Sequence, residues 1–596
     1  MDYHKTRELL VKRFDIPGAQ LLKNAVRHFT LAERTVFFFF VGMFIFSGAV
    51  LLYKVNATFL VHVPMRGGSI TEGVVGNPRF INPVLAISEA DKNLVALVYS
   101  GLLRRTPQGD LVSDLATVDT SADGLTYTAH LNPQAVFHDG TTVTADDVVF
   151  TIQKVQDPGI RSPRFADWSG VDAEKVDDQT VTFTLKKPYA PFIDNLTLGI
   201  LPKHIWKNVT SDEFLFSQFN SLPVGSGPYQ VSSVERDSGG IPNYYDLASF
   251  KQALGGEPYI SHIIFKFYPS ENALVDAYTG GDVSNLAGVS ADEAVELQKN
   301  GAHIVSDPLP RIFGVFFNQN QNKLFLDKDV RAALDLAAPK EDIIQAVLDG
   351  YGSPIDGPLP PSLFAWLPAH TAIDSATRLS EAQALLAKAG WTKNVDTGTL
   401  EKKTKHDTVS LSFSISTSDT PELKTTGDLL KKAWEQLGAH VDVQVFDQGD
   451  LNQNVIRPRH YDALLFGEVI GRDADLYPFW HSSERNDPGL NIALYANSKV
   501  DKLLEDARST SDPDKRTKDY QAFNAAVTED VPAVFLYAPS FVYALPSEIA
   551  AVNLGELLEI QDRFNGVSDW YIETDRVWQI FARHNQTLED ESNNQL

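Results

Sequence analysis

The most apolar stretch of the chain lies near its N-terminus and has the pattern of a membrane-spanning helix. Val36–Tyr53 carries no charged residue and includes six phenylalanines. Thr30 and Glu33 have the spacing of a capping box, which marks the start of a helix. A helix over residues 31–53 is about 35 Å long, enough to cross a hydrocarbon core of about 30 Å. We therefore predict a transmembrane anchor helix over residues 31–54.

A cleaved signal peptide is the alternative interpretation of the same stretch. The basic region before the apolar run is long for a signal peptide, and no clear A-x-A cleavage site follows the run. Both features favour an anchor that stays in the protein.

Beyond residue 66 the hydrophobic pattern switches repeatedly between strand and helix. Leu125–Leu131 and Val181–Leu185 alternate with period two, which is typical of half-buried strands. Asp123–Gly124 precedes the first of these and predicts a hairpin turn. Thr144 has the position of an N-cap, and an apolar stripe at helical spacing follows over Val148–Val155. The mixture predicts an α/β or α+β class.

Two further helix starts are predicted from capping boxes. Ser290 is followed at the right spacing by Glu293, and Ser380 by Gln383. Gly390 has the position of a residue that ends the second of these helices.

The composition is that of a folded, acidic protein without cysteine. Hydrophobic residues make up 43% and charged residues 22%, close to globular averages, which excludes wholesale disorder. The 52 Lys/Arg and 77 Asp/Glu give a net charge of −25, a poor fit to a nucleic-acid binder. The absence of cysteine excludes disulfides, thiol catalysis, Cys-ligated metal sites and a lipid on an N-terminal Cys.

The charge is divided unevenly along the chain. Residues 1–66 hold nine Lys/Arg and four Asp/Glu, which gives them a formal charge of +5. Because the whole chain carries −25, residues 67–596 carry −30. Most of these basic residues precede the apolar run, and the positive-inside rule then places residues 1–30 in the cytoplasm as an N-terminal arm. The arm has helically spaced apolar residues and either lies on anionic lipid or forms a short helix without a partner.

Motifs that carry catalysis are missing from the sequence. There is no H-E-x-x-H, G-x-S-x-G, Walker or Rossmann motif. Asp119–Gly124 starts like a calcium loop, but His130 stands where a bidentate Glu belongs, so a hairpin turn is favoured. Gly225–Tyr229 is better explained by a turn than by a nucleophile, because Pro228 stops the continuing helix. His138 is interpreted as a turn histidine. We predict no enzyme activity, cofactor or metal site.

Segments in a characteristic order resemble the extracytoplasmic solute-binding proteins of ABC transporters, specifically the oligopeptide/dipeptide-binding family, family 5. The resemblance covers about residues 67–580, and its most specific block joins Phe137–Gly140 to Thr144–Phe150. The other segments are Asn82–Pro83, Leu94–Leu103, Leu111–Ala116, Asp123–Tyr127, Gly225–Tyr229, Asp329–Leu334, Leu385–Trp391, Val500–Leu504 and Val531–Tyr537.

The resemblance implies a two-lobed α/β clamshell of the type II periplasmic-binding-protein kind. Its first lobe is expected from residues 67–308 and 546–581, with an extra subdomain at about 104–200. The second lobe is expected from 309–545. Crossings between lobes are expected near Pro308–Arg311 and Ala544–Pro546, with ligand bound between the lobes. Residues 582–596 are expected to form a disordered acidic tail.

A receptor for many peptides should bind what all peptides share, namely their backbone groups and terminal charges. A buried ammonium then needs a carboxylate, because an unpaired buried charge is costly. The family supplies backbone contacts from the loop that is Val84–Asp91 here, and an amine-binding acid from a segment that is Gly467–His481 here. This sequence departs from the family pattern at two positions: Glu468 stands where a Trp is expected, and Gly471 where the Asp is expected.

Peptide amine recognition by the usual acid is therefore in doubt, and several roles stay open. Arg472 either holds a ligand carboxylate or pairs with Asp473. Asp473 and Asp475 either bind ligand or cap a turn. The complete set of expected ligand-binding residues is Ile87, Ser88, Glu89, Asn318, Glu468, Arg472, Asp473, Asp475 and Trp480.

The function predicted from sequence and resemblance together is a membrane-anchored, extracytoplasmic solute receptor of an ABC importer. It is expected to bind peptides, to deliver them to permease subunits with their ATPases, and to be held by a single-pass helix with a cytoplasmic N-terminus. The alternatives are a receptor for a non-peptide solute such as a nickel complex, haem or a sugar, a membrane-anchored sensor, and a hydrolase.

Overall fold

The computed structural model describes residues 26, 28–364, 366–405, 407–471, 474–510 and 512–578. Almost all of the expected cytoplasmic arm and all of the expected acidic tail lie outside these residues. The chain divides into two compact units, one formed by Met1–Met65 with Glu573–Leu596 and one by Arg66–Ile572. Each unit is described by itself below.

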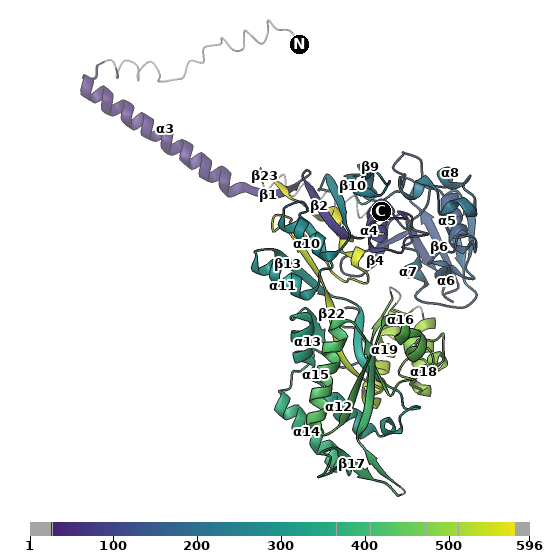
Figure 1. The fold of residues 1–596 in the computed structure, drawn as a ribbon. Helices are drawn as coiled ribbons and strands as arrows, with labels where there is room; N and C mark the ends of the chain where they lie inside the picture. The colour runs from purple at the N-terminus through teal and green to yellow at the C-terminus, as the bar shows by residue number, and fades with distance from the viewer. Residues whose placement is uncertain are drawn as a thin grey trace. The chain divides into compact units, whose positions relative to one another are not determined.

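The first unit contains the apolar helix and a two-stranded ribbon. Helix α3 (Leu31–Phe59) begins as predicted, since Thr30 and Glu33 form a capping box in which each side chain accepts from the other residue's backbone N–H. The helix is 29 residues long and ends later than the expected residue 54. Strand β1 (Leu60–Met65) follows directly and pairs antiparallel with β23 (Glu573–Trp578) (Figure 1).

The second unit is built on two sheets that share one long strand, β22 (Ala533–Leu545). The strands of the first sheet are, from its free edge, β9 (Tyr229–Arg236), β10 (Pro242–Ser249), β11 (His262–Tyr268), β2 (Ser69–Val75) and β12 (Asn285–Ala287), with β13 (His303–Pro308) also on β22. The strands of the second sheet are β20 (His440–Phe446), β19 (Ser412–Ser418), β21 (Ala463–Val469) and β14 (Arg311–Phe317), with β15 (Gly352–Pro354) also on β22. We call the parts built around these sheets the first and the second lobe.

The chain crosses from one sheet to the other at two adjacent places. Pro308 ends β13 and Arg311 begins β14, as the sequence suggests for the first crossing. The second crossing lies within β22, whose pairing changes from β15 at Pro539 to β13 at Ser540. It therefore comes earlier in the chain than the expected Ala544–Pro546. The two crossings touch, because Leu309 N–H donates to the Pro539 carbonyl at 2.9 Å.

Smaller sheets and the helices complete each lobe. In the first lobe a separate four-stranded sheet lies within the expected subdomain, with strands β5 (Ala116–Thr120), β6 (Thr126–Leu131), β8 (Thr180–Thr184) and β7 (Asp172–Asp177), beside the ribbon β3 (Leu103–Arg105) and β4 (Leu111–Ser113). The helices of the first lobe are α4 (Glu89–Val98), α5 (Ala145–Gln156), α6 (Phe165–Trp168), α7 (Phe192–Asn195), α8 (Lys203–Trp206), α9 (Ser211–Phe214), α10 (Glu271–Thr279) and α11 (Ala291–Lys299).

The second lobe carries the other helices and a small antiparallel sheet. That sheet consists of β16 (Thr392–Lys393), β17 (Leu400–Lys403) and β18 (Thr408–Ser410). The helices are α12 (Lys328–Ala337), α13 (Lys340–Leu348), α14 (Ser375–Lys388), α15 (Pro421–Leu437), α16 (Gln448–Asp450), α17 (Tyr477–Trp480), α18 (Ser498–Ser509) and α19 (Pro513–Asp530). Short 3-10 or π turns lie at Gln218–Asn220, Lys323–Leu326, Leu451–Ile456, Ser482–Arg485, Ile560–Phe564 and Val567–Asp569.

Local signals in the sequence predict some element boundaries and miss others. The predicted strands correspond to β6 and β8, and Thr144 caps α5 together with Asp147. Ser290 is the N-cap of α11, although its side chain makes no capping hydrogen bond to that helix. The capping box at Ser380 is wrong, because α14 already begins at Ser375, where Asp374 accepts from Thr377 N–H. Gly390 follows the end of α14 with a positive φ of 89°.

Each lobe has its own apolar core, formed between its sheet and its own helices. One cluster fills the first lobe and its subdomain. The second sheet is covered on both faces, since alternate residues of β14 point into different clusters: Val315 and Phe317 into one, Ile312 and Phe316 into the other. A strand buried on both faces needs this near-continuous apolar sequence.

Candidate functional site

The loop expected to contact ligand backbone is held by buried side chains at its base. Asn82 Oδ1 accepts from Val84 N–H at 2.9 Å, and Asn82 Nδ2 donates to Asn220 Oδ1 at 2.9 Å. Ser88 caps α4, and its hydroxyl accepts from Asp91 N–H. The tip of the loop is open to solvent, with Ile87 67% exposed. A rigid base with an exposed tip suits a loop that presents its backbone to a ligand.

Glu468 lies at the end of β21, beside the first crossing between the lobes. It pairs with Ile312 in the β14 register, and two residues later Ile470 N–H donates to the Pro310 carbonyl at 2.9 Å. The side chain is buried, and neither carboxylate oxygen has a hydrogen-bond partner among the described residues. Burial alone raises the pKa of Glu468 well above its ordinary value of 4.5.

An unpaired buried carboxyl is rare, because its desolvation is not compensated by any hydrogen bond. The neighbouring residue is a glycine because the Phe313 ring leaves no room for a side chain there: a Cβ on Gly467 would come within 2.8 Å of that ring. The protein therefore places a buried acid, with a raised pKa and no hydrogen-bond partner among the described residues, at the point where the two lobes join.

Asp475 is buried and already has partners in the second lobe. Its carboxylate forms an ion pair with Arg508 and accepts from Tyr477 N–H at 3.1 Å. The Arg508 guanidinium lies 4.0 Å from the centre of the Tyr477 ring. This geometry supports the turn-capping alternative for Asp475 that the sequence left open.

Arg508 is a residue that the sequence pattern did not single out. Its carbonyl accepts from Ala190 N–H of the first lobe at 2.8 Å, and its guanidinium also lies near the Tyr189 ring. It therefore links Asp475 to the subdomain of the first lobe. No local signal identifies such a contact, because its partners come from distant parts of the sequence.

Asn318 and Trp480 lie in the interior of the second lobe. Asn318 Nδ2 donates to the Arg459 carbonyl at 2.8 Å, and its Oδ1 accepts from two backbone N–H groups of the following turn. Trp480 is fully buried against Phe316 and Phe535. Their ligand-binding role stays a prediction. Arg472 and Asp473 lie outside the described residues.

His138 has the structural role that the sequence suggests. Its Nε2–H donates to the Gly227 carbonyl at 3.0 Å, and its Nδ1 accepts from Gly225 N–H at 3.3 Å. Burial lowers the pKa of His138 to about 4, so the ring is neutral at physiological pH. The histidine and the glycine turn of the resemblance therefore form one packing unit.

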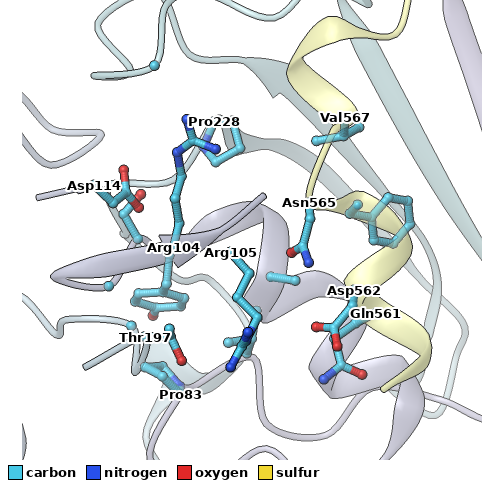
Figure 2. Close-up of a pocket in the computed structure, with 18 of the residues that line it drawn as sticks. Pro83, Arg104, Arg105, Asp114, Thr197, Pro228, Gln561, Asp562, Asn565 and Val567 are labelled. Carbon is cyan, nitrogen blue, oxygen red and sulfur yellow. The ribbon is translucent and has the colours of Figure 1, made fainter. Parts of the chain in front are cut away.

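A pocket of about 290 Å³ lies within the first lobe and is lined in part by Ala86 of the loop Val84–Asp91, next to the expected site residue Ile87. It is lined by α4, by the start of β3 and by the segment around Asp562 and Asn565 (Figure 2). Two of the charged residues that line it form ion pairs, Arg105 with Asp194 and Lys92 with Glu559. The pocket thus lies beside the base of the loop Val84–Asp91, on the side of α4 and the Asp562 segment.

The comparisons with known proteins identify the family. A family model described as "Bacterial extracellular solute-binding proteins, family 5 Middle" matches residues 110–487. The chain belongs to this family. The oligopeptide-binding protein AppA of Bacillus subtilis is 29% identical over 496 residues, covering 82% of this chain and 89% of AppA. The fold is accordingly that of a two-lobed α/β solute-binding protein.

Solved structures agree with this assignment. AppA of Bacillus subtilis in complex with a nonapeptide superposes with a TM-score of 0.60 at 28% identity, covering 86% of this chain and all of that chain. NikZ of Campylobacter jejuni in complex with Ni(L-His) has a TM-score of 0.61 at 26% identity, covering 84% of this chain and 99% of that one. Members of the same fold thus hold both peptides and metal complexes.

Proposed function

We propose that this solute-binding protein is a membrane-anchored peptide receptor that serves an ABC importer. The observation that carries the peptide assignment is the similarity, over more than four-fifths of the chain, to AppA, whose solved structure holds a nonapeptide. The ligand lies between the lobes, next to the crossings, and its backbone is read by the loop Val84–Asp91. Closure of the lobes buries it.

The unpaired carboxyl of Glu468 supports a more specific role. A peptide presents one ammonium whatever its sequence, and burying that ammonium requires a carboxylate. In this chain Gly471 occupies the position of the family's acid, so that acid is absent there. Glu468 is buried at the crossing, neither of its oxygens has a hydrogen-bond partner within the described part of the chain, and it is the acid that we assign to the ligand amine.

The proton balance of this contact follows from its environment. In the free receptor, burial disfavours the charged form of Glu468 and raises its pKa. An ammonium at hydrogen-bond distance stabilises the carboxylate, so the proton leaves to solvent as the ion pair forms. Binding of a free-amine peptide therefore releases up to about one proton.

The anchor is helix α3, with the N-terminus in the cytoplasm. Leu31–Asn56 is a candidate span of 26 residues with a mean hydropathy of 2.4, and none of its most apolar window is buried by protein. The helix passes without a linker into β1, which supports a retained anchor over a cleaved signal peptide. The solute-binding unit is then extracytoplasmic, where a permease with its cytoplasmic ATPases receives the ligand.

Native mass spectrometry of the full chain, purified in detergent, tests the peptide assignment. Co-purified peptides of mixed sequence, lost on Glu468→Gln, are the expected result. A single defined non-peptide molecule, such as a nickel complex, would overturn it. Glu435→Gln is the matched control, because Glu435 is a solvent-exposed acid of the second lobe on α15.

A further inference from the structure

The C-terminal strand of the described chain returns to the end of the apolar helix. The register of the ribbon pairs Leu60 with Trp578 at the helix end and Met65 with Glu573 at the other end. Trp578 Nε1–H donates to Asn56 Oδ1 at 2.8 Å, and its ring stacks on Phe59 with centroids 6.1 Å apart. The strand is thus attached both to β1 and to the last turn of α3.

The ribbon of β1 and β23 exposes apolar side chains that would normally pack against another part of a protein. An isolated pair of strands is marginally stable at best in water. Yet Trp578 is 43% exposed and Phe59, the last residue of α3, is 49% exposed, and none of the most apolar window of that helix is buried by protein. These exposed aromatic rings continue the apolar surface of the helix beyond its end.

The residue types change along the ribbon in a consistent order. The first two rungs are Leu60 with Trp578 and Val61 with Val577, which are apolar or aromatic. The third rung pairs His62 with Arg576, whose Nε–H donates to His62 Nε2 at 3.1 Å. The acids of β23, Asp575 and Glu573, come only after this rung.

This order matches the layers of a bilayer surface. Tryptophan is enriched at the headgroup level, and basic residues are attracted to the phosphates of anionic lipids. At about 3.4 Å per residue the Arg576 rung lies about 7 Å beyond the Trp578 rung. The acids lie farther out, where repulsion by an anionic surface is weaker.

The length of the helix places the ribbon at the right depth. The 26-residue span is about 39 Å long, which exceeds a hydrocarbon core of about 30 Å. Its last turn, with Lys54 and Asn56, therefore reaches the headgroup region, and β1 begins there. The partner surface that fits the ribbon is the phospholipid headgroup layer itself.

We propose that β23 is a second membrane-contacting segment, in which Trp578 and Arg576 enter the headgroup layer of the bilayer beside α3. This inference rests on the proposed anchoring by α3. Both ends of the solute-binding unit then lead to the membrane, since β1 precedes it and β23 follows it in the chain. A single flexible tether would leave the unit free to turn, whereas two strands paired at the membrane surface restrict it.

The lack of cysteine makes a site-specific test direct, because one introduced cysteine is the only thiol in the chain. Nitroxide labels at Val577→Cys and, separately, at its register partner Val61→Cys report depth by accessibility to oxygen and to a water-soluble nickel chelate. The full chain is studied in nanodiscs of zwitterionic and anionic phospholipid, with one copy in each disc. Thr574→Cys, an exposed position on the same strand, is the matched control.

We expect the Val577 and Val61 labels at equal depth in the headgroup layer and the Thr574 label in water. Arg576→Glu should move the Val577 label toward water in the anionic discs. A Val577 label as accessible to the chelate as that of Thr574, or unequal depths at Val577 and Val61, would overturn the inference. Protection that requires a second copy or a permease in the disc would do the same.

A label at Phe44→Cys separates this inference from the anchor on which it depends. Phe44 lies in the middle of the apolar run and is 79% exposed in the helix. If its label lies in the hydrocarbon core while that of Val577 lies in water, only the ribbon inference fails. If the Phe44 label also lies in water, the proposed anchor fails as well.

Discussion

Each lobe buries a glutamate on a central strand, and the two have opposite surroundings. Glu72 on β2 accepts from Arg563 Nη2–H at 2.8 Å through Oε1 and from the Tyr543 hydroxyl at 2.8 Å through Oε2. Glu72 and Arg563 are both fully buried. Glu468 on β21 is buried to nearly the same extent, yet neither of its oxygens has a partner among the described residues.

The difference separates an acid that serves the fold from one that is available to a ligand. The Glu72 cluster joins β2 to the segment that returns after β22, so it ties distant parts of the first lobe together. Glu468 forms no hydrogen bond through its carboxylate to any residue that the structure describes, and its desolvation is a cost to the fold. A buried acid that destabilises the fold, at the junction of two lobes, is typical of a residue with a role in function.

Breaking the ion pair between Glu72 and Arg563 should have the largest effect on stability. Arg563→Met leaves Glu72 buried without its guanidinium and should lower the free energy of unfolding by about 3–5 kcal/mol. Urea denaturation of the full chain in detergent, followed by tryptophan fluorescence, measures the loss. The double variant Glu72→Gln with Arg563→Met should recover part of it, and a loss below about 1 kcal/mol in the single variant would contradict this account.

Removing the unpaired acid should instead affect binding. Glu468→Gln deletes the charge assigned to the peptide amine and should weaken peptide binding by about 1.5–3 kcal/mol, roughly a 10- to 150-fold rise in Kd. Titration calorimetry with a free-amine peptide measures it, with Glu435→Gln as the control that leaves Kd unchanged. N-acetylation of the peptide should reduce the difference between wild type and Glu468→Gln.

Asp475 sharpens the contrast inside the second lobe, because it is a buried acid that is paired. Asp475→Asn removes the ion pair with Arg508 and should lower stability by about 1.5 kcal/mol without changing peptide affinity. Thermal unfolding and calorimetry on the same variant measure the two quantities. A loss of affinity as large as that of Glu468→Gln would transfer the ligand-binding role to Asp475.

For a change of a single pH unit, the pH dependence of stability should show the smallest effect. The folded protein holds the Glu468 proton more tightly than the unfolded chain, whose carboxyl titrates near 4.5. The folded state therefore binds more protons above that pH, and stability falls as pH rises, by at most about 1.4 kcal/mol per pH unit. Melting temperatures of wild type and Glu468→Gln between pH 5 and 8 measure this, and parallel curves would contradict it.

Local signals in the sequence predict local structure well. The capping box at Thr30, the N-cap at Thr144 and the strand that became β6 depend on neighbours a few residues away, so their patterns suffice. The capping box predicted at Ser380 is wrong because another local signal nearby competes with it. The stretch before it is equally able to form a helix, and Asp374 offers an earlier cap.

Local sequence patterns do not predict contacts between residues that are far apart in the sequence. The pairing of Glu72 with Arg563, of Asp475 with Arg508, and of β1 with β23 depends on how the chain folds back. Glu468 was expected at the site from the resemblance, but only the structure reveals that it is unpaired. The sequence could therefore indicate the lobes and the family, whereas the distinction between structural and available acids required the fold.

The most direct test of the central claim is the number of protons released when a peptide binds. Calorimetric titration of the full chain with one free-amine peptide, in buffers of different ionisation enthalpy, gives that number. This account predicts release of up to about one proton by the wild type and none by Glu468→Gln. A peptide that fails to bind, or that binds both forms with equal affinity and no proton release, would contradict it.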